Sequence, residues 1–315
     1  PFKIFFHCTT KSGKWHGPPE KFLAGEGKNC YNKAKSDKRG ESMNYTEKNG
    51  DLLAAVPGFS LSDTLNCGQC FRWKQTGDRF HGIHQGHPLT VSQEGELLRF
   101  YGISPEELET VWIPYFDLEG DYLGLNRTYE GDPVLKRACR FAGGIRILRQ
   151  DPWEALCSFI ISQNNNIPRI KGIVSRLCDL LGEPAGDDRS FPAPEKLAEQ
   201  TEKSLAPLRA GFRNGYLLDA ARKVASGEVP LSDIETMPLD EARETLRKIR
   251  GVGPKVAECT LLYGFHRLDA FPIDTWIRKA LERYFPDGFP EVPAKGVAQQ
   301  YLFHSIRSWP EENAE

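Results

Sequence analysis

Hydrophobic and polar residues alternate along the chain between about residues 51 and 101. Short apolar runs at 70–74, 79–84, 87–92 and 96–101 are separated by the turn signals Thr-Gly-Asp, Gln-Gly and Gln-Glu-Gly. A period of two, interrupted by such turns, predicts an antiparallel meander of strands. A helix is expected to follow, with Ser104 as its cap and Pro105 at its first position.

Beyond residue 130 the apolar positions recur with the period of an α-helix almost throughout. Asp-Pro pairs open helices near residues 132 and 151, and a broad amphipathic face covers 167–181. Further helices are predicted at 193–200, 214–225, 239–249, 254–264, 274–284 and 294–307. The pattern therefore predicts an α+β chain, with an antiparallel β domain at 50–130 and a helical domain at 131–315.

Residues 1–49 differ from the rest in composition, because they are rich in Lys, Gly, Ser and Asn and have few periodic apolar positions. We expect them to form an extension that is disordered or not native to the fold. The first 50 residues carry 10 Lys and Arg against 5 Asp and Glu, although the whole chain has a net charge of −2. The remainder is thus acidic, and any nucleic-acid surface on it must be a local patch.

Cysteine usage and hydropathy exclude several classes of protein. Eight scattered cysteines are too few for a disulfide scaffold and suit a reducing cytoplasm. The C-x-x-C pair of Cys67 and Cys70 has no second half, so an ordinary strand is favoured there over a metal site. No apolar run approaches the roughly 18 residues that a membrane span requires. We therefore expect no metal and no membrane association.

The segment Arg-Gly-Val-Gly-Pro-Lys at 250–255 predicts a tight turn between two helices. Gly251 and Gly253 permit the turn, and Pro254 occupies the first position of the second helix. In such a helix-hairpin-helix, the backbone N–H groups of the turn and the helix N-terminus can hold a phosphate. A glycine-capped turn without any ligand is an equal alternative from this pattern alone.

Lys255 lies in the first turn of that second helix, where the helix dipole disfavours a cation. We expect its amine to lose its proton more readily than a solvated lysine does, which would make it a nucleophile of the Schiff-base type. Cys259 is four residues further and shares its helical face. Asp274 is either a plain helix cap or a carboxylate that faces Lys255 and stabilises a sugar cation. A solvated surface lysine is the alternative for Lys255.

Several stretches together resemble the helix-hairpin-helix DNA glycosylases, and among them the 8-oxoguanine branch. They are Gly-Val-Gly-Pro-Lys-Val-Ala-Glu-Cys at 251–259, Phe-Pro-Ile-Asp-Thr-Trp at 271–276, and the segments 66–73, 144–154, 158–170 and 297–303. The resemblance covers about residues 52–307. It implies a TATA-binding-protein-like antiparallel sheet followed by an all-α glycosylase domain. It also implies a bifunctional glycosylase and AP lyase of base excision repair.

The resemblance assigns roles to residues around the damaged base. Lys255 matches the lysine that attacks the sugar C1′, forms a Schiff base and then eliminates the 3′ phosphate, and Asp274 matches the essential carboxylate. The base has to be flipped out of the duplex. The residues implied to bind it are Gly68, whose carbonyl accepts the N7–H of 8-oxoguanine, Gln299, which reads the Watson–Crick edge, and Cys259 and Phe303, which sandwich the ring.

The resemblance also assigns the residues that contact the DNA. Asn164 fills the vacated space and reads the opposite cytosine, Arg169 and Arg213 share that cytosine, and Phe212 is an aromatic wedge. Gly251 and Gly253 hold the backbone. A polar helix end is the alternative reading of Asn164. The implied partner is double-stranded DNA containing 8-oxoguanine opposite cytosine, bound by a monomer.

Two departures refine the resemblance. Animal members carry a His and an Asp where this chain has Trp276 and Ile306, which indicates a bacterial-type member in the cytoplasm, associated with the nucleoid. No Cys follows Cys259, so no iron-sulfur cluster, and no other cofactor, is expected. The alternatives are a related glycosylase of different base specificity or a non-catalytic helix-hairpin-helix DNA-binding module.

Overall fold

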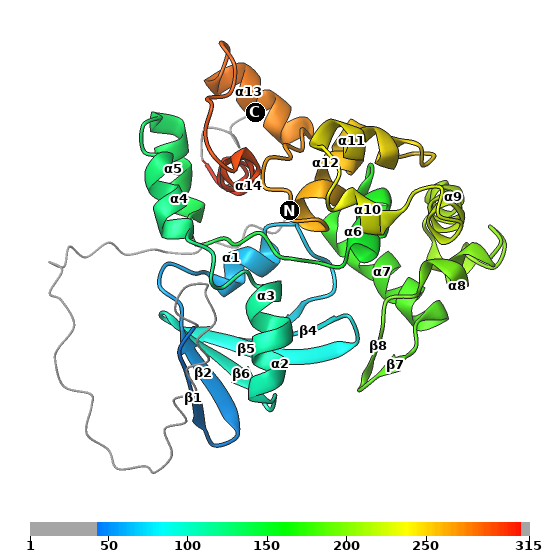
Figure 1. Cartoon of the computed structure of the whole chain (residues 1–315), viewed down its shortest axis with the longest axis horizontal. Coiled ribbons are helices and arrows are strands. Elements are labelled where there is room, and N and C mark those ends of the chain that lie inside the picture. Colours follow the sequence, from blue (N-terminus) through cyan, green and yellow to red (C-terminus); the bar gives the residue numbers. More distant parts are fainter. Residues whose placement is uncertain (1–42, 310–315) are drawn as a thin grey trace, which may run out of the picture. The chain divides into compact units, whose positions relative to one another are not determined.

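The computed structural model describes residues 43–309, so most of the extension predicted at 1–49 lies outside the described residues. The described residues fall within one compact unit. Among them, no helix is both long enough and apolar enough to cross a membrane. The chain is α+β, as predicted, with an antiparallel sheet followed by helices (Figure 1).

The sheet has six antiparallel strands in the order β1-β2-β6-β5-β4-β3. Their bounds are β1 (Tyr45–Lys48), β2 (Asp51–Ala55), β3 (Lys74–Thr76), β4 (Arg79–His84), β5 (His87–Glu94) and β6 (Leu97–Tyr101). Alternation explains its buried face, since Leu52 and Ala54 point into the core opposite Phe100 and Leu98. The helical segments α2 (Pro105–Glu107), η1 (Leu108–Trp112) and α3 (Ile113–Tyr115) cover this core, as Figure 1 shows.

Two parts of the sheet region differ from the prediction. Strand β1 lies inside the extension predicted at 1–49. The apolar pattern missed this strand because its side chains are mostly exposed and its pairing with β2 rests on the backbone. Residues 70–73 form no strand. Instead, α1 (Leu61–Asn66) leads into a buried loop that contains both Cys67 and Cys70. Burial raises the pKa of the Cys67 thiol to about 12, and no group of metal-binding residues occurs within 43–309.

The helical part contains the predicted helices, with boundaries shifted by a few residues, and three short helical segments at 122–128, 206–208 and 231–234 that were not predicted. The bounds are α4 (Tyr122–Thr128), α5 (Pro133–Ala142), α6 (Pro152–Ser162), α7 (Ile167–Leu181), α8 (Pro194–Ala198), η2 (Ala206–Leu208), α9 (Arg213–Ala225), α10 (Leu231–Ile234), α11 (Leu239–Arg247), α12 (Pro254–Tyr263), α13 (Thr275–Tyr284) and α14 (Lys295–Ile306). The short strands β7 (Pro184–Ala185) and β8 (Asp188–Arg189) form a separate hairpin. Caps set several starts: Asp132, Asp151 and Asn166 each accept a backbone N–H at the first turn.

The loop after α1 is fixed to the segment that precedes α6. The side chain of Gln69 is completely buried, donates to the Arg146 carbonyl at 2.8 Å and accepts from the Leu148 amide at 3.0 Å. Gln150 in turn donates to the Gln69 carbonyl at 2.8 Å. Because these buried hydrogen bonds would be lost in any other conformation, they hold the loop after α1 in a single conformation. The neighbouring Gly68 is thereby held against the helical part.

Candidate active site

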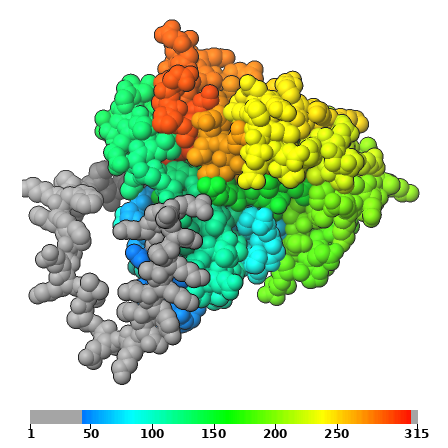
Figure 2. Space-filling model, viewed as in Figure 1, coloured from blue at the N-terminus to red at the C-terminus, as the bar shows by residue number. Residues whose placement is uncertain are grey.

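The glycine turn joins α11 to α12, as the sequence predicts. Gly251 has a φ of +83°, and a Cβ built on it would lie 2.3 Å from the ring of Tyr216. Both facts require glycine at this position. In the described part of the chain, no side chain caps the start of α12, and no atom lies within 4 Å of a Cβ built on Gly253. Space and backbone N–H groups are thus available for a phosphate. The segment from α11 to α13 forms a continuous surface in Figure 2 (yellow to orange).

Lys255 is half-buried on the first turn of α12. Its Nζ donates to Ser162 Oγ at 3.2 Å and lies 5.1 Å from the ring centroid of Phe159. Both partners belong to the end of α6. Among residues 43–309, no carboxylate lies within ion-pair distance of Lys255. The amine therefore has polar and aromatic neighbours without a fixed counter-ion. Neither Ser162 nor Phe159 was singled out by the sequence motifs.

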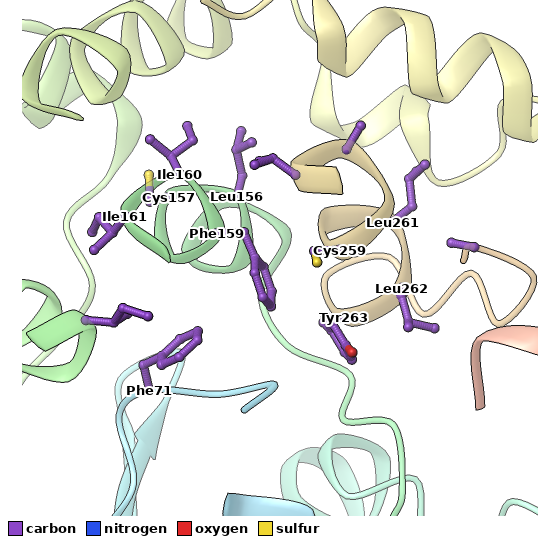
Figure 3. Close-up of a cluster of buried hydrophobic side chains, with 14 of the residues drawn as sticks. Phe71, Leu156, Cys157, Phe159, Ile160, Ile161, Cys259, Leu261, Leu262 and Tyr263 are labelled. Atoms are coloured by element: carbon purple, nitrogen blue, oxygen red, sulfur yellow. The ribbon is translucent and has the colours of Figure 1, made fainter. Parts of the chain in front are cut away.

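Cys259 is buried one turn beyond Lys255. Burial raises the pKa of its thiol, although the charge of Lys255 and a hydrogen bond to it act in the opposite direction. The two side chains are therefore neighbours, as their spacing predicts. Figure 3 shows Cys259 and Tyr263 of α12 facing Phe159 of α6, and the Phe159 and Tyr263 rings stack with centroids 5.2 Å apart. A thiol in these surroundings is a neutral apolar group.

Asp274 is the N-cap of α13, and its Oδ1 accepts the Ile277 N–H at 2.8 Å. The capping alternative is thus confirmed as a structural role. A cap also fixes where the carboxylate lies, which a catalytic carboxylate requires. The segment leading to it is held by two side chains that the sequence motifs did not identify as contacts of this segment. Glu258 accepts the Phe271 N–H at 2.6 Å, and Gln299 donates to the Pro272 carbonyl at 3.0 Å.

The residues predicted to bind the base converge from two parts of the chain. Gln299 is buried on α14, and its Oε1 has no hydrogen-bond partner among residues 43–309. Phe303, one turn later, is half-buried, and a Cβ built on Gly68 would lie 3.9 Å from its ring. Gly68 has a φ of +94°, which suits glycine. A buried acceptor without a partner is uncommon and is expected to serve a ligand.

The residues predicted to contact the opposite strand lie in the turn between α6 and α7, in the first turn of α7 and at the start of α9. Asn164 is exposed with a φ of +46°, and Arg169 is exposed on α7. Phe212 is 56% exposed and meets Tyr216 edge-on at 5.6 Å between centroids. An exposed aromatic ring of this kind is available to contact a base.

Arg213 differs from the expectation that its guanidinium reaches the opposite base. It is only 3% exposed and donates to the carbonyls of Gln163, Asn164 and Ala210. Burial lowers its pKa, and the nearby charge of Arg169 lowers it further. Four of its five N–H groups are used in these bonds. In this structure Arg213 holds the turn that presents Asn164.

Comparison with known proteins finds two family models that match consecutive parts of the chain. Residues 52–156 match the N-terminal domain of 8-oxoguanine DNA glycosylase, and residues 157–290 match the HhH-GPD superfamily of base excision DNA repair proteins. The N-glycosylase/DNA lyase of Saccharomyces cerevisiae is 30% identical over 274 residues, which cover 76% of this chain and 72% of that protein.

Two solved structures of the Clostridium acetobutylicum 8-oxoguanine glycosylase/lyase are also similar. The complex with double-stranded DNA containing cytosine opposite to 8-oxoG is 38% identical, with a TM-score of 0.77 over 86% of this chain and 98% of that chain. The apo form is 39% identical, with a TM-score of 0.76 over 83% and 99%. The chain therefore belongs to the 8-oxoguanine DNA glycosylases of the HhH-GPD superfamily of base excision DNA repair proteins.

Proposed function

We propose that this N-glycosylase/DNA lyase removes 8-oxoguanine from duplex DNA with Lys255 as its nucleophile and Asp274 as its stabilising carboxylate. The carrying observation is the position of the Lys255 amine, which contacts a hydroxyl and an aromatic face beside a neutral thiol. A lysine used only for phosphate contact or stability has no need of these neighbours. The bound duplex of the Clostridium enzyme supports double-stranded DNA with cytosine opposite the lesion as the partner.

The proposed reaction begins with an unprotonated Lys255. Its nitrogen lone pair attacks C1′ while the bond from C1′ to the base breaks and its electrons leave with the base. Asp274 stabilises the positive charge that develops on the sugar. A proton passes from the amine to O4′ as the C1′–O4′ bond breaks, which opens the sugar ring and leaves a protonated Schiff base, and the departed base takes a proton from water. A proton then passes from C2′ to water, its bonding electrons form a C2′=C3′ double bond, and the C3′–O bond breaks with its electrons leaving on the 3′ phosphate, which cuts the strand.

Lesion recognition is proposed to use the carbonyl of Gly68 and the amide of Gln299. The Gly68 carbonyl would accept the N7–H of 8-oxoguanine, a donor that guanine lacks. Gln299 already donates to Pro272 through Nε2, so its free Oε1 would accept from the Watson–Crick edge. Phe303 and Cys259 would bound the two ring faces. We further propose a monomer that acts in the bacterial cytoplasm at the nucleoid.

A panel of duplexes tests this function. Each duplex carries 8-oxoguanine opposite one of the four bases, and a fifth carries guanine opposite cytosine. We expect base release, strand cleavage and a borohydride-trapped covalent complex with 8-oxoguanine opposite cytosine, and none of these with guanine. Binding to all duplexes with no trapped complex would instead indicate a protein that only grips the DNA backbone.

Replacing Gln299 by Ala should weaken the preference for 8-oxoguanine over 8-oxoadenine, which has the same N7–H but no N1–H donor on its Watson–Crick edge, by about tenfold or more, since one buried hydrogen bond decides about 1–3 kcal/mol. The measurement is the ratio of single-turnover excision rates on the two bases. The ratio removes any general slowing caused by losing the bond to Pro272. Gln300→Ala is the matched control, because Gln300 is a buried amide on the same helix that contacts Tyr263. Equal selectivity in both variants would place recognition elsewhere.

A further inference from the structure

Glu258 lies on α12, three residues after Lys255, and forms a hydrogen bond with the segment that carries Asp274. Its Oε2 accepts the Phe271 N–H at 2.6 Å. Its Oε1 forms an ion pair with Arg243 of α11, and only 13% of the Glu258 side chain is exposed. Arg243 also pairs with Asp240 on its own helix. Glu258 therefore connects three elements: both helices of the hairpin and the segment before α13.

The segment 271–274 has no regular secondary structure, so its position depends on such contacts. Glu258 holds its first residue and Gln299 holds the next one through the Pro272 carbonyl. The following helix begins at Thr275, with Asp274 as its cap. The location of the Asp274 carboxylate relative to α12 is thus set from one side by Glu258 and from the other by α14.

The chemistry of the bond makes Glu258 more than a surface ion pair. The Phe271 N–H is a backbone donor in a partly buried place, and a carboxylate acceptor gives a charge-assisted bond. An apolar side chain at 258 would pack there but would leave that donor without a partner. The proposed reaction also demands accuracy, because a shift of about 1 Å in a catalytic group can cost about 100-fold in rate.

We propose that Glu258 is a positioning residue that fixes Asp274 relative to α12, which carries Lys255, by accepting a hydrogen bond from the Phe271 amide. This rests on the catalytic roles proposed above for Lys255 and Asp274. Both carboxylate oxygens of Glu258 are engaged, one by the Phe271 amide and the other by Arg243. It acts through the carboxylate of Asp274, and its contribution belongs to the step in which the base leaves.

The first test compares two substrates with the Glu258→Ala variant. On 8-oxoguanine opposite cytosine, the single-turnover rate of base release should fall by up to about 100-fold, while the dissociation constant for the duplex stays unchanged. On DNA that already contains an abasic site, no base has to leave, so borohydride trapping through Lys255 should be almost unaffected. Equal losses on both substrates would overturn the proposal, since they indicate a general structural defect.

Two further variants separate the two bonds of Glu258. Glu258→Gln keeps an oxygen acceptor for the Phe271 N–H and loses the charge, whereas Arg243→Gln removes the ion pair and leaves the acceptor. Both should retain most of the rate of base release. If Glu258→Ala does not fold, these two variants still test the proposal. A fall in the rate of base release as large as that caused by Asp274→Asn, in either variant, would contradict it.

A double-mutant cycle supplies an independent test. In an Asp274→Asn background, Glu258→Ala should add almost no further loss, because the group through which it acts has already been removed. In a Phe303→Ala background, the two losses should multiply. Full additivity with Asp274→Asn would sink the proposal. Failure of the proposed function is distinct from these outcomes, since it would appear as normal excision by Lys255→Gln in an otherwise unchanged chain.

Discussion

Lys255→Gln should abolish both release of 8-oxoguanine and borohydride trapping, while binding to lesion DNA survives. An amide has no lone pair able to attack C1′, whereas Gln keeps a polar side chain with N–H donors at this position. Loss of a nucleophile typically costs on the order of 10⁴-fold or more. Single-turnover excision and gel-shift titration with the same duplex measure the two properties separately.

Lys171→Gln is the matched control for this change. The Nζ of Lys171 donates to the Trp73 carbonyl at 2.8 Å, so this lysine also has a defined polar contact. Its partner Trp73 belongs to neither α6 nor α12. Its substitution should leave excision and trapping at the wild-type level. Unchanged excision by Lys255→Gln would remove Lys255 from the mechanism and with it the proposed Schiff base.

Asp274→Asn should slow base excision by about 100- to 1,000-fold, the usual cost of losing one electrostatic contact to the transition state. Asn caps helices about as well as Asp, so α13 should keep its start and thermal unfolding should change little. The charge is thereby removed without removing the cap. Single-turnover rates with 8-oxoguanine opposite cytosine measure the effect.

Asp132→Asn provides the same substitution at another cap. Asp132 caps α5 and accepts the Val134 and Leu135 N–H groups, both at 2.9 Å. Excision by this variant should match the wild type. If Asp274→Asn and Asp132→Asn excise equally fast, Asp274 is only a cap, and the stabilisation of the sugar cation must come from another group.

The period of the apolar positions was enough to predict the strands and helices whose packing it reflects. It could not reveal β1, because an exposed edge strand is held by its backbone and its side chains carry no pattern. It misassigned residues 70–73, since a short apolar run has the same appearance in a strand and in a buried loop. The difference comes from tertiary contacts such as those of Gln69.

The candidate site residues were predicted one by one from the resemblance, and their roles stay predictions. The structure places Lys255 beside Ser162 and Phe159, and Gly68 beside Phe303. The resemblance could not predict contacts in which a side chain binds a backbone carbonyl or amide. The burial of Arg213 follows from the left-handed φ of Asn164, which turns two carbonyls toward the guanidinium. The bond from Phe271 to Glu258 likewise exists only once α12 and the 271–274 segment have packed.

The end of α6 has one further consequence. Ser162, the last residue of that helix, contacts the Lys255 amine, and Asn164 follows only two residues later on the turn that Arg213 holds. The residue proposed to face the intact strand is therefore only two positions from the contact of the proposed nucleophile. We therefore expect a base other than cytosine opposite the lesion to slow excision without weakening the binding of the duplex. Discrimination of the opposite base would then lie in the reaction rate and not in the affinity.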